Sequence, residues 1–192
     1  MITVVKYDSE PCERIKEILT NLNADFKIST NEADICGADK IILPDGQDMR
    51  VIFRKLHLLN LYSLLKMIRK PVLGIGSGMF LMCEHLGVDN ICGLGMLPID
   101  AKNNNTPNEI QTKKKISIKD NSKILQNIKA NPKFIFRQII ELPLTNFTTS
   151  TMHINNLECT ASLEKDNRYG VQFIPELSGE DGIQIFKNFI DL

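Results

Sequence analysis

A glycine-rich turn between an apolar strand and a helix is the stretch of this chain best placed to do chemistry. It reads Pro71-Val-Leu-Gly-Ile-Gly-Ser-Gly-Met-Phe-Leu-Met-Cys83, and its apolar start is typical of a strand buried on both faces. Glycine tolerates the unusual backbone angles of a sharp strand-to-helix turn. Such turns present a nucleophile in many α/β enzymes. Here the expected tip is Gly76, which carries no side chain.

Neighbouring side chains offer little replacement chemistry. We expect the Ser77 hydroxyl to satisfy the first turn of the helix, and Cys83 to be a buried structural cysteine. His85 is expected near the end of the same helix, where the helix dipole favours it. The alternate glycines could also cradle a phosphate or carboxylate with backbone amides. They do not match the dinucleotide fingerprint, because Met79 stands where a third spaced glycine is needed.

The elements before this turn alternate between strand and helix. Apolar runs predict strands at residues 2–5, 25–28, 39–43 and 72–75. A helix is expected from Ser9, as its cap, to about residue 22, and one long or two short helices between residues 47 and 70. This order is typical of an open parallel sheet with helices on both faces. Sites in such sheets lie at the carboxyl ends of the strands, here after Leu43 and Ile75.

The second half of the chain is less regular. Strands are expected at residues 134–136, 148–154, 158–163 and 169–173, in part as antiparallel hairpins, before a final amphipathic helix that begins at residue 179. Residues 102–115 include Asn103–Asn105 and Lys113–Lys115, and this polarity predicts a solvated loop. We therefore predict one α/β domain over residues 1–192, an open, mostly parallel, flavodoxin-like sheet with an antiparallel extension in its C-terminal half.

The composition limits the possible partners and ligands. Lys and Arg total 23 and Asp and Glu total 23, so net charge favours neither nucleic acid nor a membrane surface. No apolar run approaches the ~20 residues that cross a bilayer. Cysteines without Cys-x-x-Cys spacing indicate a reducing, cytoplasmic setting. His57, His85 and His153 are far apart, and Cys83 and His85 would face different sides of a helix, so we expect no metal and no cofactor.

Two motifs resemble those of class I glutamine amidotransferases. The stretch from Pro71 to Met79 is similar to their Pro-Val-Leu-Gly-Ile-Cys-x-Gly-Met elbow, and Tyr169-Gly-Val-Gln-Phe-Ile-Pro-Glu-Leu-Ser-Gly-Glu-Asp-Gly182 is similar to their Gly-Val-Gln-Phe-His-Pro-Glu signature. The closing Gly-Glu-Asp-Gly is typical of the glutaminase subunit of imidazole glycerol phosphate synthase. In active relatives a cysteine attacks the glutamine amide, a histidine carries the proton and a glutamate orients the histidine.

This chain departs from that pattern at the functional positions. The resemblance places Gly76 at the cysteine position and Ile174 at the histidine position, and leaves only Glu176 of the three. The matching substrate-binding positions, Gly46, Ser77 and Phe80, are degenerate as well. The resemblance therefore implies a fold without its glutaminase chemistry. Ser77 lacks a base at position 174, and His153 would reach the site only if its strand ran differently from the family's.

Two functions stay open at this point. The resemblance implies a pseudoenzyme that forms a heterodimer with a cyclase-like barrel or another synthase subunit, in histidine biosynthesis or a related nitrogen-insertion route. The alternative is an enzyme or small-anion-binding protein that uses the same cleft with Glu176, Ser77 or Arg137. Arg137 lies near where relatives commonly hold the substrate with His-Ser-Tyr.

Overall fold

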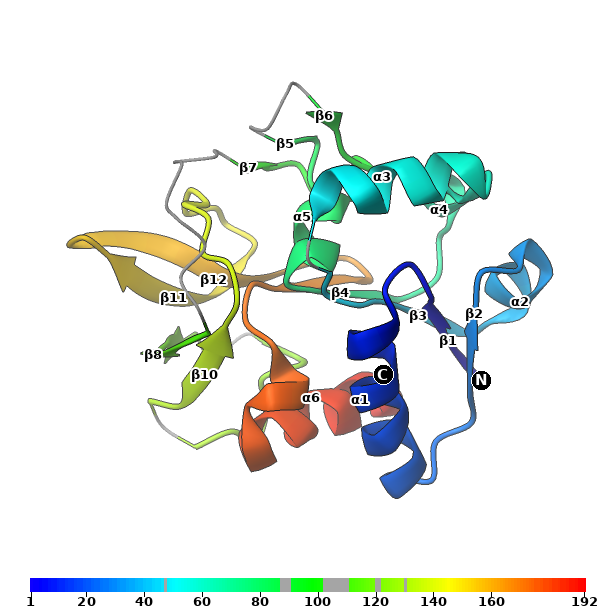
Figure 1. Ribbon diagram of the computed structural model, residues 1–192. Coiled ribbons are helices and arrows are strands. Elements are labelled where there is room, and N and C mark those ends of the chain that lie inside the picture. The colour runs from blue at the N-terminus through cyan, green and yellow to red at the C-terminus, as the bar shows by residue number, and fades with distance from the viewer. Residues whose placement is uncertain (47, 87–90, 102–110, 120–121, 130) are drawn as a thin grey trace.

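An eight-stranded mixed sheet organises the part of the chain that the structure describes (Figure 1). The computed structural model describes residues 1–46, 48–86, 91–101, 111–119, 122–129 and 131–192. The strand order is β2-β1-β3-β4-β13-β12-β11-β9, and the first five strands are parallel. Their bounds are β2 Phe26–Ser29, β1 Ile2–Val5, β3 Lys40–Leu43, β4 Val72–Ile75 and β13 Arg168–Val171. The antiparallel extension is β12 Leu157–Lys165, β11 Thr148–Ile154 and β9 Ser117–Ile118.

Helices cover both faces of this sheet (Figure 1). One face carries α3 Met49–Leu58, α4 Leu61–Met67 and α5 Ser77–Met82, and the other carries α1 Ser9–Asn21 and α6 Gly179–Asp191. The short α2 Glu32–Gly37 lies near β2, and the 3-10 turn η1 Pro175–Leu177 precedes α6. Strand side chains alternate between the two apolar clusters: Ile41 and Leu43 face the α3–α5 side, whereas Ile42 faces α1 and α6.

The described residues also form two smaller sheets. One contains β6 Ile91–Cys92, β5 His85–Leu86 and β7 Asp100–Ala101, in that order. The other pairs β8 Thr112–Lys115 with β10 Lys133–Phe136. None of the described helices has the length and apolar character needed to span a membrane.

The predicted α/β class, parallel sheet and antiparallel extension are confirmed, and several local predictions are wrong. The alternative of two short helices after residue 47 is confirmed, since α3 and α4 are separated at Asn60, whose φ is 56°. Ser9 is the first helical residue, and Asp8 takes the cap position.

The lysine run was predicted to be a loop, but Lys113–Lys115 lie in β8. Phe134 and Phe136 explain this, because both are buried against Phe173, Phe134 stacked on its ring and Phe136 edge-on to it. Their burial fixes the position of β10, and the backbone groups of β10 pair with those of β8. The lysine side chains of β8 stay partly or fully exposed. The asparagine run at 103–105 lies outside the described residues.

The position of His85 is a further correction. The helix after the turn ends at Met82, and His85 begins β5 instead of extending the helix. The carbonyls at the helix end accept hydrogen bonds from residues after Gly93: Leu81 from Leu94 N at 2.8 Å and Met82 from Met96 N at 2.9 Å. These returning amides satisfy the helix end and stop it after six residues.

Glycine is required at position 78 by a close approach between α5 and β3. A Cβ on Gly78 would collide with the carbonyl oxygen of Leu43 and lie 2.7 Å from its carbonyl carbon. We expect Gly78→Ala to lower the free energy of unfolding by about 2–3 kcal/mol, because backbone atoms would have to separate. The matched control is Gly37→Ala, where an added Cβ meets nothing within 4 Å. Denaturant unfolding of both variants measures the difference, and equal stabilities would contradict the prediction.

Candidate functional site

The turn between β4 and α5 has the backbone of an elbow. Gly76 adopts φ 52° and ψ −118°, a conformation that favours glycine. Its N–H donates to Val171 O at 2.8 Å, and its carbonyl accepts from Met79 N at 3.0 Å. The loops after β3, β4 and β13 therefore meet around Gly76, at the carboxyl ends of three adjacent parallel strands.

Asp45, which follows β3, fills the space in front of Gly76. A Cβ on Gly76 would overlap Oδ1 of Asp45, and would lie 2.7 Å from its Cγ and 2.9 Å from Cδ1 of Ile174. Asp45 and Ile174 are 3% and 1% exposed. The structure thus brings Gly76 and Ile174 together, and the buried carboxylate of Asp45 lies against Gly76 as well.

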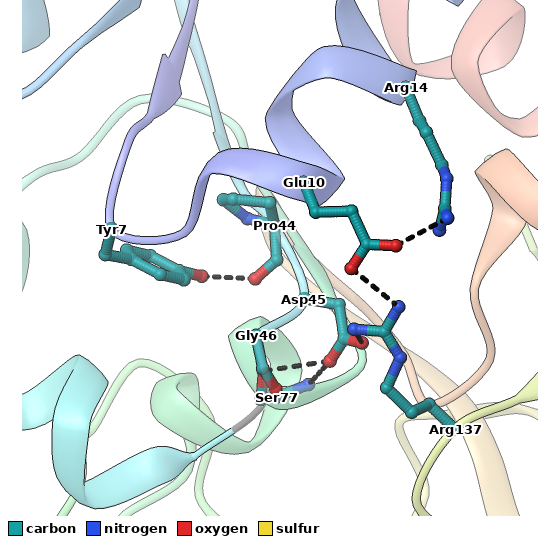
Figure 2. Close-up of polar contacts among 8 residues, drawn as sticks. All are labelled: Tyr7, Glu10, Arg14, Pro44, Asp45, Gly46, Ser77 and Arg137. Atoms are coloured by element: carbon teal, nitrogen blue, oxygen red, sulfur yellow. Dashed lines mark hydrogen bonds and ion pairs between the residues drawn. The ribbon is translucent and has the colours of Figure 1, made fainter. Parts of the chain in front are cut away.

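The carboxylate of Asp45 is held by the first residue of α5 (Figure 2). Oδ1 lies 2.9 Å from Ser77 N and 2.9 Å from Ser77 Oγ. The Ser77 hydroxyl is also 3.1 Å from Gly46 O, so its single proton serves two acceptors on the β3 loop. We expected this hydroxyl to satisfy its own helical turn, and that expectation is wrong. The hydroxyl lies against oxygens of the loop after β3 and not against the amides of its own helix.

A chain of alternating charges extends from Asp45 toward α1. Nη1 of Arg137 lies 3.2 Å from Oδ2 of Asp45, and its Nη2 lies 3.7 Å from Oε2 of Glu10. Glu10 in turn pairs with Arg14 at 2.5 Å. Figure 2 shows the four side chains in this order, with the Tyr7 hydroxyl donating to Pro44 O beside them. The guanidinium of Arg137 therefore balances the buried carboxylate.

Hydrogen bonds to backbone groups on both sides of Arg137 fix the segment that carries it. The Gln172 side chain, which is fully buried, accepts from Ile140 N at 3.1 Å and donates to Ile140 O at 3.0 Å. On the other side of Arg137, Ile174 N donates to Ile135 O at 2.7 Å. Both anchors come from the stretch that follows β13, so the second sequence motif positions Arg137 as well as Ile174.

Glu176 lies on η1 with one carboxylate oxygen, Oε2, buried and without a hydrogen-bond partner. Burial raises its pKa to about 8, and the charge of Asp45 adds to the rise. A hydrogen bond from its own backbone and the positive charges of Arg137 and Arg14 act in the opposite direction. Glu176 is therefore mostly protonated at neutral pH. Burial and the charge of Asp45 also raise the pKa of Tyr7 well above its ordinary value, so its phenol stays neutral.

Of the remaining residues of interest, Gly46 lies in the site through its carbonyl near Ser77, whereas the side chains of Phe80, His153 and Cys83 take no part in the contacts around Asp45. Phe80 is fully buried in the cluster on the α3–α5 side. Gly46 packs against α3, since a Cβ there would lie 2.7 Å from Cδ1 of Ile52. His153 is exposed on β11, and Cys83 is buried directly after α5. Sequence reasoning missed Asp45 and Glu10 as members of the site. The available signal for Asp45 was an acidic residue two positions beyond the end of a buried strand.

The fold and the elbow define this chain as a class I glutamine amidotransferase-type protein. A family profile described as the SNO glutamine amidotransferase family matches residues 7–192, so the chain belongs to that family. It is 30% identical over 197 residues to the imidazole glycerol phosphate synthase subunit HisH of Bacteroides thetaiotaomicron, in a match that covers 100% of this chain and 99% of the relative.

Solved structures show the same fold at lower identity. A putative GMP synthase component from Thermoplasma acidophilum aligns with a TM-score of 0.73 and 19% identity, over 99% of this chain and 92% of that chain. PurLQS from Thermotoga maritima aligns with a TM-score of 0.69 and 17% identity, over 99% and 97%. These similarities support the α/β architecture.

Glu176 makes the stability of the protein depend on pH. Its pKa rises from 4.5 to about 8 on folding, so the folded state binds the proton more tightly. The free energy of unfolding should therefore fall as pH rises from about 4.5 to about 8. Glu176→Gln keeps the neutral shape and should remove this part of the pH dependence. Urea unfolding at about pH 5 and about pH 8 would test it.

Glu180→Gln is the matched control, because Glu180 is exposed at the start of α6. Its pH profile should follow that of the unmodified protein. A Glu176→Gln profile that also follows the unmodified protein would show that Glu176 is not protonated in the folded state.

Proposed function

We propose that this chain is a catalytically degenerate glutamine amidotransferase subunit that does not hydrolyse glutamine and acts as the non-catalytic partner of a synthase subunit. The proposal assigns Gly76 to the nucleophile position, Ile174 to the base position and Glu176 to the orienting carboxylate. One observation carries it: the Asp45 carboxylate lies where a side chain at position 76 would project, and it accepts the N–H of Ser77.

The chemistry of amide hydrolysis supports this assignment. The reaction needs an activated nucleophile and backbone N–H groups that stabilise a developing oxyanion. The residue after the nucleophile commonly supplies one such N–H, and here that donor already binds Asp45. A fixed negative charge at this point repels an oxyanion. Loss of a nucleophile or base alone costs roughly 10⁶ in rate in a comparable triad.

The first test is ammonia release from glutamine. We expect no release above the uncatalysed background, with or without a candidate synthase partner, because the chain offers neither thiol nor imidazole at the elbow. The positive control is a parallel assay of an active glutaminase from the same family. Turnover within a few tenfold of that control would contradict the proposal.

The second test is restoration of the missing side chains. We expect Gly76→Cys combined with Ile174→His to remain inactive, because the new Cβ would overlap Asp45 and the Ser77 N–H would stay occupied. The comparison variant adds Asp45→Gly to the pair and so frees both the space and the donor. Robust glutamine hydrolysis in the double variant would show that Asp45 does not block the site.

The partner is inferred from the relatives. The Bacteroides thetaiotaomicron relative is named as a subunit of a synthase. By resemblance, the partner of this chain would be a cyclase-like barrel or another synthase subunit, bound as a heterodimer. Affinity capture from the native cell should recover such a subunit.

The alternative function is an enzyme or small-anion-binding protein of changed chemistry that uses the same cleft with Glu176, Ser77 or Arg137. The contacts of Asp45 oppose it, because this carboxylate already takes the Ser77 N–H and pairs with Arg137. Calorimetry with inorganic phosphate separates the two functions. Saturable phosphate binding by a solitary monomer would favour the alternative.

A further inference from the structure

Four side chains with metal-binding atoms gather on the small sheet formed by β6, β5 and β7, outside the site around Gly76. In the strand register, His85 lies opposite Cys92 on one side and beside Asp100 on the other. Residues paired across neighbouring strands project from the same face of a sheet. Cys92, His85 and Asp100 therefore form a row across three strands.

Burial shows which way this row faces. His85, Cys92 and Asp100 are all exposed, whereas Leu86 and Ala101, the next residues of β5 and β7, are buried. The row thus faces solvent while the other face packs on the core. Tyr62 holds the backbone at one end of the row, since its hydroxyl lies 3.2 Å from Cys92 O.

The ligand atoms of three of these side chains are close enough to share an ion. Nδ1 of His85 lies 2.8 Å from Oδ1 of Asp100. Among the described residues, Glu84 joins these two in a group whose ligand atoms all lie within 4.8 Å of one another. Ligands bound to one zinc ion at about 2.0–2.3 Å are separated by less than that limit, so the spacing of these three groups suits a shared ion. Cys92 is not part of this group, and it joins the site through its position opposite His85 in the strand register.

We propose that Glu84, His85, Cys92 and Asp100 bind one zinc ion. The set is mixed, with sulfur, nitrogen and oxygen donors, and this combination suits zinc better than magnesium or calcium, which prefer oxygen alone. On binding, the Cys92 thiol releases its proton to solvent and the neutral imidazole of His85 donates a lone pair. The ion would link three strands of two residues each.

The sequence argument against a metal site assumed that His85 continues the helix. On a helix, Cys83 and His85 would face different sides, and the three histidines lie far apart in sequence. Placing His85 on β5 changes its neighbours to Cys92 and Asp100, seven and fifteen positions away. The proposed zinc site does not depend on whether the chain hydrolyses glutamine.

The test is calorimetric titration of the reduced, metal-free full-length protein with Zn²⁺. We expect one ion per chain. His85→Ala and Cys92→Ser should each weaken binding at least about tenfold. Titration with Co²⁺ provides a second readout, because a cobalt–thiolate bond gives an absorption band that should be lost in Cys92→Ser.

Matched controls are Cys36→Ser and His153→Ala, which change the same residue types at exposed positions on α2 and β11. Both should bind Zn²⁺ as the unmodified protein does. Unfolding midpoints measured with a chelator present would confirm that every variant folds. Absence of saturable binding would overturn the proposal, and so would His85→Ala or Cys92→Ser binding Zn²⁺ as tightly as the controls.

Discussion

The buried carboxylate of Asp45 is the constraint on which the arrangement of the site depends. A charged group out of water is costly unless hydrogen bonds and an opposite charge compensate it. Here the compensation comes from the Ser77 N–H and hydroxyl on one oxygen and the Arg137 guanidinium on the other. Because Glu10 and Arg14 of α1 continue the chain of charges, one carboxylate couples four segments that are distant in sequence.

The parallel part of the sheet explains why these segments meet. β4 lies between β3 and β13, so the loops that leave these three strands emerge at one edge. Each loop contributes one residue: Asp45 after β3, Gly76 after β4 and Ile174 after β13. The absence of a side chain at Gly76 creates the space, and Asp45 occupies it. The glutamine amidotransferase architecture is thus retained while its elbow is filled from within the chain.

The regular alternation of strands and helices in the first half of the chain made much of the fold predictable. The strands β1 and β4 begin and end where the apolar runs indicated, and the strand–helix order predicted the sheet. Local rules failed where a distant contact decided the structure. Lys113–Lys115 form a strand because Phe134 and Phe136 bury β10 beside them. The helix after Gly76 stops at Met82 because amides from Leu94 and Met96 return to its last carbonyls.

The amino-acid sequence by itself determined the α/β class, the elbow without a side chain and the family resemblance, because these depend on periodicity and on short motifs. Only the tertiary structure decided that Asp45 lies in front of Gly76, that Arg137 pairs with it, and that His85 stands between Cys92 and Asp100. The reason is that a carboxylate or imidazole takes its partner from whichever segments the sheet brings alongside, and sequence spacing carries no record of that proximity.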